Sequence, residues 1–162
     1  MDIRYLTVSE LIYINGTVLK RPDISAGTQQ IRDIQLLDAA VARPAASAFG
    51  ADAYPTLREK AAALLHSVAR NHPFADGNKR TATVAVIFMF HVNGQSVVWH
   101  QNDALPVILS VAEGTFEVDE VAAWFPLAER PYSAHPDSDA DMRLIAQIIR
   151  EQKWLLHELE RQ

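Results

Sequence analysis

Apolar side chains recur at intervals of three and four residues over most of this chain, which predicts a mainly helical protein. Proline, glycine and capping residues set the expected bounds of seven helices. These helices are expected at residues 7–20, 28–43, 55–71, 77–92, 103–113, 118–128 and 141–162. Thr7 or Ser9 is expected to cap the first helix, Thr28 the second and Asp103 the fifth. The expected fold class is therefore all-α.

The helix expected at 77–92 differs from the others because the run from Val84 to Phe90 is apolar on every side. Such a run also fits a buried strand, but its length and the Asn93-Gly94 stop favour a helix. A helix without a polar face belongs at the centre of a bundle. Between the helices, residues 95–100 are expected to be extended, and residues 45–54 form either a loop or a short hairpin.

The pattern divides the chain into three parts. A compact six-helix body is expected at residues 1–128, a linker at 129–140 and a C-terminal amphipathic helix at 141–162. Pro131 and Pro136 mark the linker, and Gln152 interrupts the apolar stripe of the last helix. For that helix, packing on the body, dimerisation, an ordered tail and a restraint that covers the active groove all remain open.

Composition narrows the class of protein. The length of 162 residues suits one domain with a sizeable core. A net charge of −5 and a pI near 5.6 disfavour nonspecific binding to nucleic acid or an anionic membrane. The chain has no cysteine for a disulfide or a thiolate metal site. No signal peptide or membrane-spanning run is recognisable, so we expect a soluble cytoplasmic protein with no direct nucleic-acid or membrane partner.

The candidate chemistry lies in the segment from His72 to Ala82, between two expected helices. The helix that begins near Gly77 offers unpaired N–H groups and a dipole that favours an anion. Lys79 and Arg80 add positive charge, and a guanidinium binds phosphate oxygens in pairs. His72 has a reference pKa of about 6.5 and can accept a proton from a hydroxyl near neutral pH.

Asp76 is an unusual neighbour for an anion unless a divalent cation lies between them. Mg²⁺ is the natural choice, because it binds through one or two carboxylates together with substrate phosphates. The segment therefore predicts phosphoryl or nucleotidyl transfer to a hydroxyl. The plainer alternative for Asp76 and Asn78 is that they only start the helix. The segment is neither a P-loop, because the upstream glycine is missing, nor a His-Glu-x-x-His zinc site.

The stretch from His72 to Arg80 resembles the signature of the Fic/Doc superfamily, His-Pro-Phe-x-(Asp/Glu)-Gly-Asn-(Gly/Lys)-Arg. All nine positions fit, and Leu36–Pro44 and Tyr54–Leu57 look like the stretches that precede the motif in death-on-curing (Doc-type) members. The resemblance covers roughly residues 3–128 and implies a Fic/Doc-type helical bundle. Lys79 and Thr83 replace a glycine and an arginine that are typical of AMP-transferring members, and both differences point to the Doc branch.

The resemblance implies a toxin that transfers the terminal phosphate of ATP to a threonine of elongation factor Tu and stops translation. It makes His72 the catalytic base, with Arg80 beside it, and makes Asp76 the Mg²⁺ ligand. Gly77, Asn78, Lys79 and Arg80 would bind the phosphates of ATP. Residues 43–54 would correspond to the flap that positions the target.

Regulation of the superfamily implies a protein partner. Many members carry an inhibitory helix with a Ser/Thr-x-x-x-Glu-(Gly/Asn) pattern, and no Ser or Thr of this chain has Glu four residues later. Doc-type toxins are instead held by a separate antitoxin. Two alternatives to phosphate transfer stay open, namely transfer of AMP or another nucleotidyl group to a protein hydroxyl, and a catalytically inactive Fic-fold binding module.

Overall fold

The computed structural model describes residues 2–20, 30–132 and 135–162. Within these residues the fold consists of α-helices with four very short strands, so the all-α prediction is confirmed. The elements in chain order are α1 (Val8–Val18), α2 (Ile34–Ala42), the 3-10 turn Arg43–Ala45, β1 (Ser47–Ala48), β2 (Ala51–Asp52), α3 (Leu57–Asn71), α4 (Asn78–Val92), β3 (Gln95–Val97), α5 (Gln101–Glu113), α6 (Val118–Trp124), β4 (Leu127–Glu129), α7 (Ser138–Glu151) and α8 (Lys153–Glu160).

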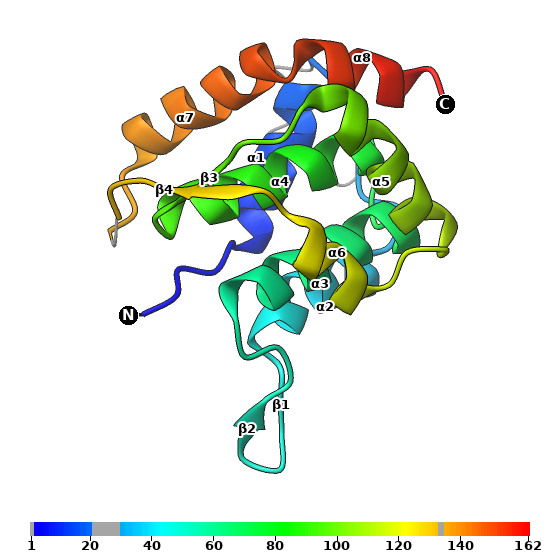
Figure 1. The fold of residues 1–162 in the computed structure, drawn as a ribbon. Coiled ribbons are helices and arrows are strands. Elements are labelled where there is room, and N and C mark those ends of the chain that lie inside the picture. The colour runs from blue at the N-terminus through cyan, green and yellow to red at the C-terminus, as the bar shows by residue number, and fades with distance from the viewer. Residues whose placement is uncertain (1, 21–29, 133–134) are drawn as a thin grey trace.

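Helix α4 lies at the centre of the bundle, as its apolar sequence predicts. Every residue from Val84 to Phe90 is buried. The helix packs against α3, α1, α5, α7 and α8, which together surround it (Figure 1). Burial of so many apolar side chains, each worth about 1.5–3 kcal/mol, fixes α4 and therefore the segment that precedes it.

The first helix starts where the sequence predicts. The Thr7 hydroxyl accepts from the N–H of Glu10, and the Glu10 carboxylate accepts from the N–H of Thr7. This reciprocal pair is a capping box, typically worth about 1 kcal/mol. The helix runs through Asn15 and Gly16 and ends at Val18, two residues before the expected bound.

The second helix is shorter than predicted. Its expected cap, Thr28, lies outside the described residues, and α2 begins only at Ile34, with Asp33 as its N-cap. The preceding residues run extended beside the motif loop, where Ile31 forms an antiparallel bridge with Phe74. The N–H groups of Arg32 and Asp33 both bind the carbonyl of Pro73. These bonds replace the intrahelical ones, which is why the helical apolar spacing is overridden here.

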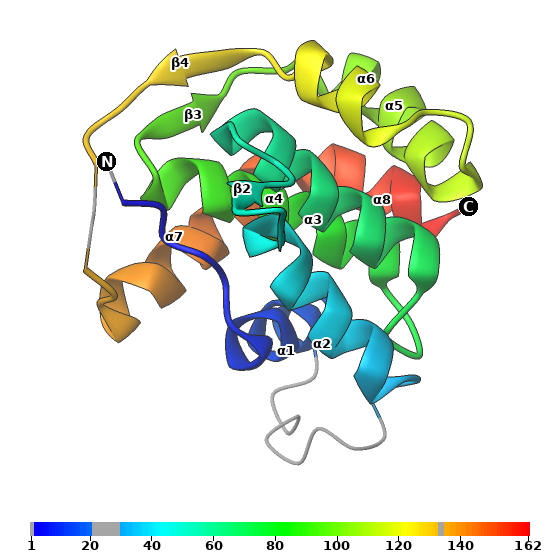
Figure 2. The same cartoon turned by 90° about the horizontal axis from the view of Figure 1, so that it is seen from below.

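Residues 45–54, left open between a loop and a hairpin, contain the antiparallel hairpin β1–β2. Phe49 and Gly50 form its tip with φ values of 54° and 80°. The hairpin projects from the body at the N-terminal end of α3 (Figure 1), and it overlies the body in the view from below (Figure 2). His72 caps the other end of this 15-residue helix, so about 22 Å of helix axis separates the base of the hairpin from the motif. The flap role stays a prediction.

Three predicted bounds near the C-terminal half are wrong. Helix α5 begins at Gln101 after His100, and Asp103 lies in its first turn instead of capping it. Helix α6 ends at Trp124, and Leu127–Glu129 pairs as β4 with β3 instead of continuing the helix or opening a linker. Pro126 explains the difference, because proline disfavours helix at the residue before it and lacks the N–H that an extension requires.

The C-terminal segment forms two helices rather than the single one predicted. The break lies at Gln152, whose side chain accepts a hydrogen bond from Trp99 Nε1 at 3.0 Å. The side chain of Gln101 binds backbone groups on both sides of this break. It donates to the carbonyl of Glu151 at the end of α7 and accepts from the N–H of Leu155 at the start of α8. Helix α7 packs on α4 and α1, and α8 packs on α5 and α4, so both lie against the body. No helix within the described ranges is both long and apolar enough to cross a membrane.

Candidate functional site

The motif loop begins with a backbone conformation that a histidine rarely adopts. His72 ends α3 in the left-handed region, with φ 54° and ψ 60°. This conformation costs a residue with a Cβ about 1–2 kcal/mol, so the surroundings must hold it. Arg32 does so from outside the loop, because its Nε donates to the carbonyl of His72 at 2.5 Å and its Nη2 to that of Asn71 at 2.8 Å. The arginine thereby also satisfies carbonyls at the C-terminal end of α3.

The stretch from Gln30 to Asp33 fixes the next part of the loop as a strand would. Arg32 N–H binds the carbonyl of Pro73 at 2.8 Å, and the N–H of Ala75 binds the carbonyl of Gln30 at 2.8 Å. Phe74 is fully buried in the core. The loop is therefore anchored on one side by backbone pairing and on the other by an apolar side chain.

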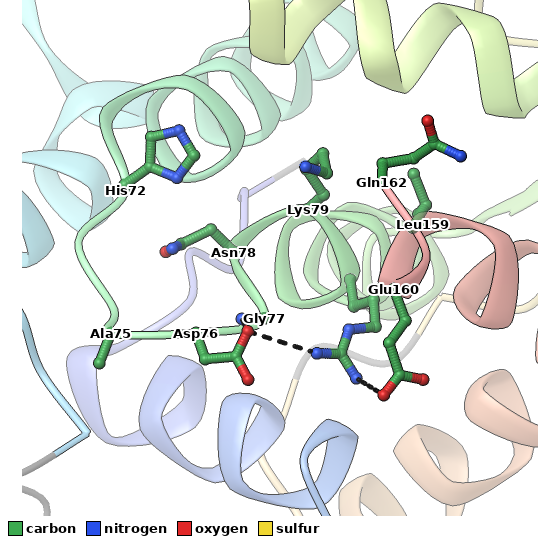
Figure 3. Close-up of a pocket in the computed structure, with 10 residues that line it drawn as sticks. His72, Ala75, Asp76, Gly77, Asn78, Lys79, Leu159, Glu160 and Gln162 are labelled. Carbon is green, nitrogen blue, oxygen red and sulfur yellow. Dashed lines mark hydrogen bonds and ion pairs between the residues drawn. The ribbon is translucent and has the colours of Figure 1, made fainter.

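Asn78 closes the loop on itself. Its Oδ1 accepts from the N–H of Phe74 and its Nδ2 donates to the carbonyl of Phe74, both at 2.9 Å. The side chain is buried and turns back toward the loop (Figure 3). Asn78 therefore uses its amide to shape the loop, and a contact with an anion would fall to its backbone N–H.

Helix α4 opens at the floor of the site. Gly77 precedes it with φ 75°, and the first intrahelical bond runs from Thr81 N–H to the carbonyl of Gly77. The N–H groups of Asn78, Lys79 and Arg80 thus come before the first intrahelical donor, at the positive end of the dipole. This arrangement is suited to an anion.

All six residues predicted to act line one pocket of about 180 Å³. They are His72, Asp76, Gly77, Asn78, Lys79 and Arg80. The C-terminal end of the chain supplies the other wall through Leu159, Glu160 and Gln162. In Figure 3, His72 and Glu160 lie at opposite ends of the site, with Asn78 and Lys79 between them.

Arg80 is the charged centre of this pocket and holds two carboxylates. Its Nη2 lies 3.6 Å from Asp76 Oδ1, and its Nη1 lies 3.7 Å from Glu160 Oε1. The guanidinium side chain is 12% exposed, whereas that of Glu160 is 58% exposed. Sequence reasoning missed Glu160, because its spacing matches no inhibitory pattern and only the packing of α8 brings it here.

The environment keeps His72 uncharged near neutral pH. Partial burial lowers its pKa below the usual 6.5, and the positive charges of Lys79 and Arg32 lower it further. A neutral imidazole is the form that can accept a proton from a hydroxyl.

Asp76 is the carboxylate of the motif loop that is suited to a hard cation, and Glu160 is the other carboxylate that lines the pocket. No group of three or more possible ligands occurs in the described part of the chain. Asp76 directs Oδ1 to the N–H of Gly77 at 2.7 Å, and its side chain is 66% exposed. One exposed carboxylate fits an ion such as Mg²⁺ that is held mainly by substrate phosphates and water.

Known proteins resemble this chain in the region that contains the motif loop. A model described as the Fic/DOC family matches residues 5–90, more than half of the 162 residues, and stops short of the 128 boundary expected from the sequence. The protein named Toxin Doc of Mycolicibacterium smegmatis is 48% identical over 99 residues, which are 60% of this chain and 76% of that protein. The matched region contains the whole segment from His72 to Arg80. This chain belongs to the Fic/Doc family.

Proposed function

We propose that this chain is a Doc-type toxin that transfers the terminal phosphate of ATP to a protein hydroxyl in the cytoplasm, with a threonine of elongation factor Tu as the target. The observation that carries the proposal is the convergence of His72, Asp76, Lys79 and Arg80 on one pocket at the start of a helix. The similarity to a protein named Toxin Doc supports the same conclusion.

In this proposal His72 accepts the proton of the attacking hydroxyl, because its lowered pKa keeps it neutral. Arg80, Lys79 and the N–H groups at the start of α4 hold the phosphate oxygens and offset the charge that develops on them. Asp76 would hold Mg²⁺, which supplies positive charge to the transferring phosphate. The residues thus separate proton transfer at one end of the pocket from phosphate binding at the other.

Lys79 supports transfer of phosphate rather than of AMP. It lines the pocket one residue before Arg80, where AMP-transferring members carry glycine. A long cationic side chain occupies room that glycine leaves open and attracts an additional phosphate oxygen. We infer that this changes which phosphate of ATP faces the hydroxyl.

The proposal includes an antitoxin as partner. A relative named Toxin Doc points to a toxin–antitoxin pair, in which the partner holds the toxin inactive. The pocket of this chain is partly exposed, and Asp76 and His72 both reach solvent. A partner that covers this face would prevent access of the target.

The test is incubation of the purified protein with elongation factor Tu, Mg²⁺ and ATP labelled separately at the α and γ phosphates. Transfer of γ label, together with an intact-mass increase of one phosphate, is expected. The substitution His72→Ala should abolish it, whereas His100→Ala, at an exposed histidine outside this pocket, should not. Transfer of α label would instead establish nucleotidyl transfer, and ATP binding without any transfer would favour an inactive binding module.

A further inference from the structure

A fully buried asparagine supports the site from below. Asn15 lies in the middle of α1 with an exposure of 0%. Its Nδ2 donates to the backbone carbonyl of Asp76 at 2.9 Å and to the hydroxyl of Thr81 at 3.0 Å. One side chain of the first helix thus binds the residue before Gly77 and the first residue whose N–H closes α4.

The orientation of this amide is fixed by its partners. The carbonyl of Asp76 can only accept, so the atom of Asn15 that faces it must be the donor Nδ2. On the other side, Asn15 Oδ1 accepts from Gln30 Nε2 at 2.7 Å, and the same Nε2 donates to the carbonyl of Ile12. Gln30 therefore donates to Asn15, and Asn15 donates to Asp76, in a directed chain of hydrogen bonds that ends at the motif, while Gln30 is itself held by its bond to the backbone of α1.

The motif rests directly on α1 at this point. A Cβ added to Gly77 would lie 3.0 Å from Leu19 Cδ2 and 3.4 Å from Asn15 Nδ2. The turn that directs the N–H groups of residues 78–80 is thus held between Asn15 beneath and the Gln30–Asp33 stretch beside it. A small rotation of the Asp76 peptide would move both its carboxylate and these N–H groups.

We infer that Asn15 is a positioning residue of the phosphate site: it holds the Asp76 carbonyl so that the Asp76 carboxylate and the start of α4 face the same ligand. Asn15 does not line the pocket and acts only through Asp76 and Thr81. The inference rests on the proposed function for the identity of the ligand, Mg-ATP, but not for the geometry.

Asn93 provides a matched control at the other end of α4. It is also a buried asparagine, 2% exposed, and its amide makes three hydrogen bonds, two with the backbone of Arg4 and one with the carbonyl of Met89. The substitutions Asn15→Leu and Asn93→Leu therefore remove the same groups from equally buried places. Asn15→Asp is a second variant that keeps the volume and the acceptor for Gln30 but loses the donor.

The experiment compares these variants by amide hydrogen exchange and by Mg-ATP titration. Asn15→Leu and Asn15→Asp should speed exchange of the Ala75 and Thr81 amides at least ten-fold more than Asn93→Leu does, and should weaken Mg-ATP binding at least ten-fold. Asn93→Leu should lower the unfolding midpoint while leaving Mg-ATP affinity within two-fold of the unsubstituted protein.

Equal effects of the Asn15 and Asn93 substitutions on Mg-ATP affinity, or unchanged exchange at Ala75 and Thr81, would overturn the inference. If the unsubstituted protein transfers no phosphate, the proposed function fails. The exchange comparison still decides the role of Asn15 in that case, because it requires no substrate.

Discussion

The contact between Arg80 and Glu160 predicts how a substitution in the C-terminal helix changes the affinity for Mg-ATP. A phosphate oxygen that approaches Nη1 of Arg80 meets the Glu160 carboxylate, which lies 3.7 Å from that atom. The substitution Glu160→Gln removes the negative charge and keeps the size of the side chain. Leu155, Leu156 and Leu159 stay buried, so α8 is expected to remain in place. Mg-ATP should therefore bind the Glu160→Gln protein more tightly.

The geometry sets the size of this effect. The separation exceeds that of a hydrogen bond and the Glu160 side chain is 58% exposed, so the pair belongs to the weak class of partly solvated ion pairs. Such pairs contribute about 0.2–1 kcal/mol. Because 1.4 kcal/mol corresponds to a factor of ten, the dissociation constant for Mg-ATP should fall by roughly 1.4- to 5-fold. The gain should shrink at high salt, since screening weakens interactions between exposed charges.

Isothermal titration of Mg-ATP into each variant at low and high salt measures this gain. Glu158→Gln is the matched control, because Glu158 lies on the same helix but pairs with Arg161 instead of Arg80. An unchanged or weaker affinity of Glu160→Gln would refute the reasoning. A similar gain in Glu158→Gln would show that net charge, and not the Arg80 contact, sets the affinity.

Three further predictions concern the loop and the histidines. Gly77→Ala should lower the unfolding free energy by about 1–2 kcal/mol in urea titrations, because φ is +75° and the new Cβ would lie 3.0 Å from Leu19. The pH–rate profile of transfer should have its acid limb below pH 6.5, because burial, Lys79 and Arg32 lower the pKa of His72; a limb at or above that value would contradict the assignment. Burial and the charge of Arg130 lower the pKa of His91 to about 4 in the folded protein. As the pH drops below about 6.5, His91 takes up a proton in the unfolded chain before it does so in the folded protein. The free energy of unfolding should therefore fall between about pH 6.5 and pH 4. Urea unfolding at pH 7 and pH 5 should show this loss, and His91→Phe should reduce it.

The central helix and the motif could be predicted from the sequence because their signals are local. The apolar run from Val84 to Phe90 has no polar face, so only the middle of a bundle can bury it. The motif residues adjoin one another in sequence, and the start of α4 brings their groups to one pocket. The start of the first helix is likewise a local signal, because Thr7 and its capping partner Glu10 are three residues apart.

The supports of the site could not be predicted because they connect distant segments. Arg32 binds the carbonyl of His72 from 40 residues away, and the helical spacing around it predicts a helix that the loop displaces. Asn15 gives one weak signal, because it is a polar residue within an apolar stripe. The neighbouring sequence, however, does not indicate which residues it binds. The division of the last helix depends on Gln101 and Trp99, which stabilise the break at Gln152 from another part of the chain.

These supports explain how a strained motif is kept ready for a ligand. His72 and Gly77 both have positive φ, so the loop between them would relax if it stood alone. Two segments outside it prevent this: the Gln30–Asp33 stretch binds its backbone, and α1 binds the Asp76 carbonyl through Asn15. A third segment, α8, only closes the wall of the pocket with Glu160. The first two segments form hydrogen bonds with the loop backbone. Glu160 instead contacts the guanidinium of Arg80, which a bound phosphate would also contact. Changes in the first two segments should therefore alter the geometry of the site, and changes in α8 should alter chiefly the competition for Arg80.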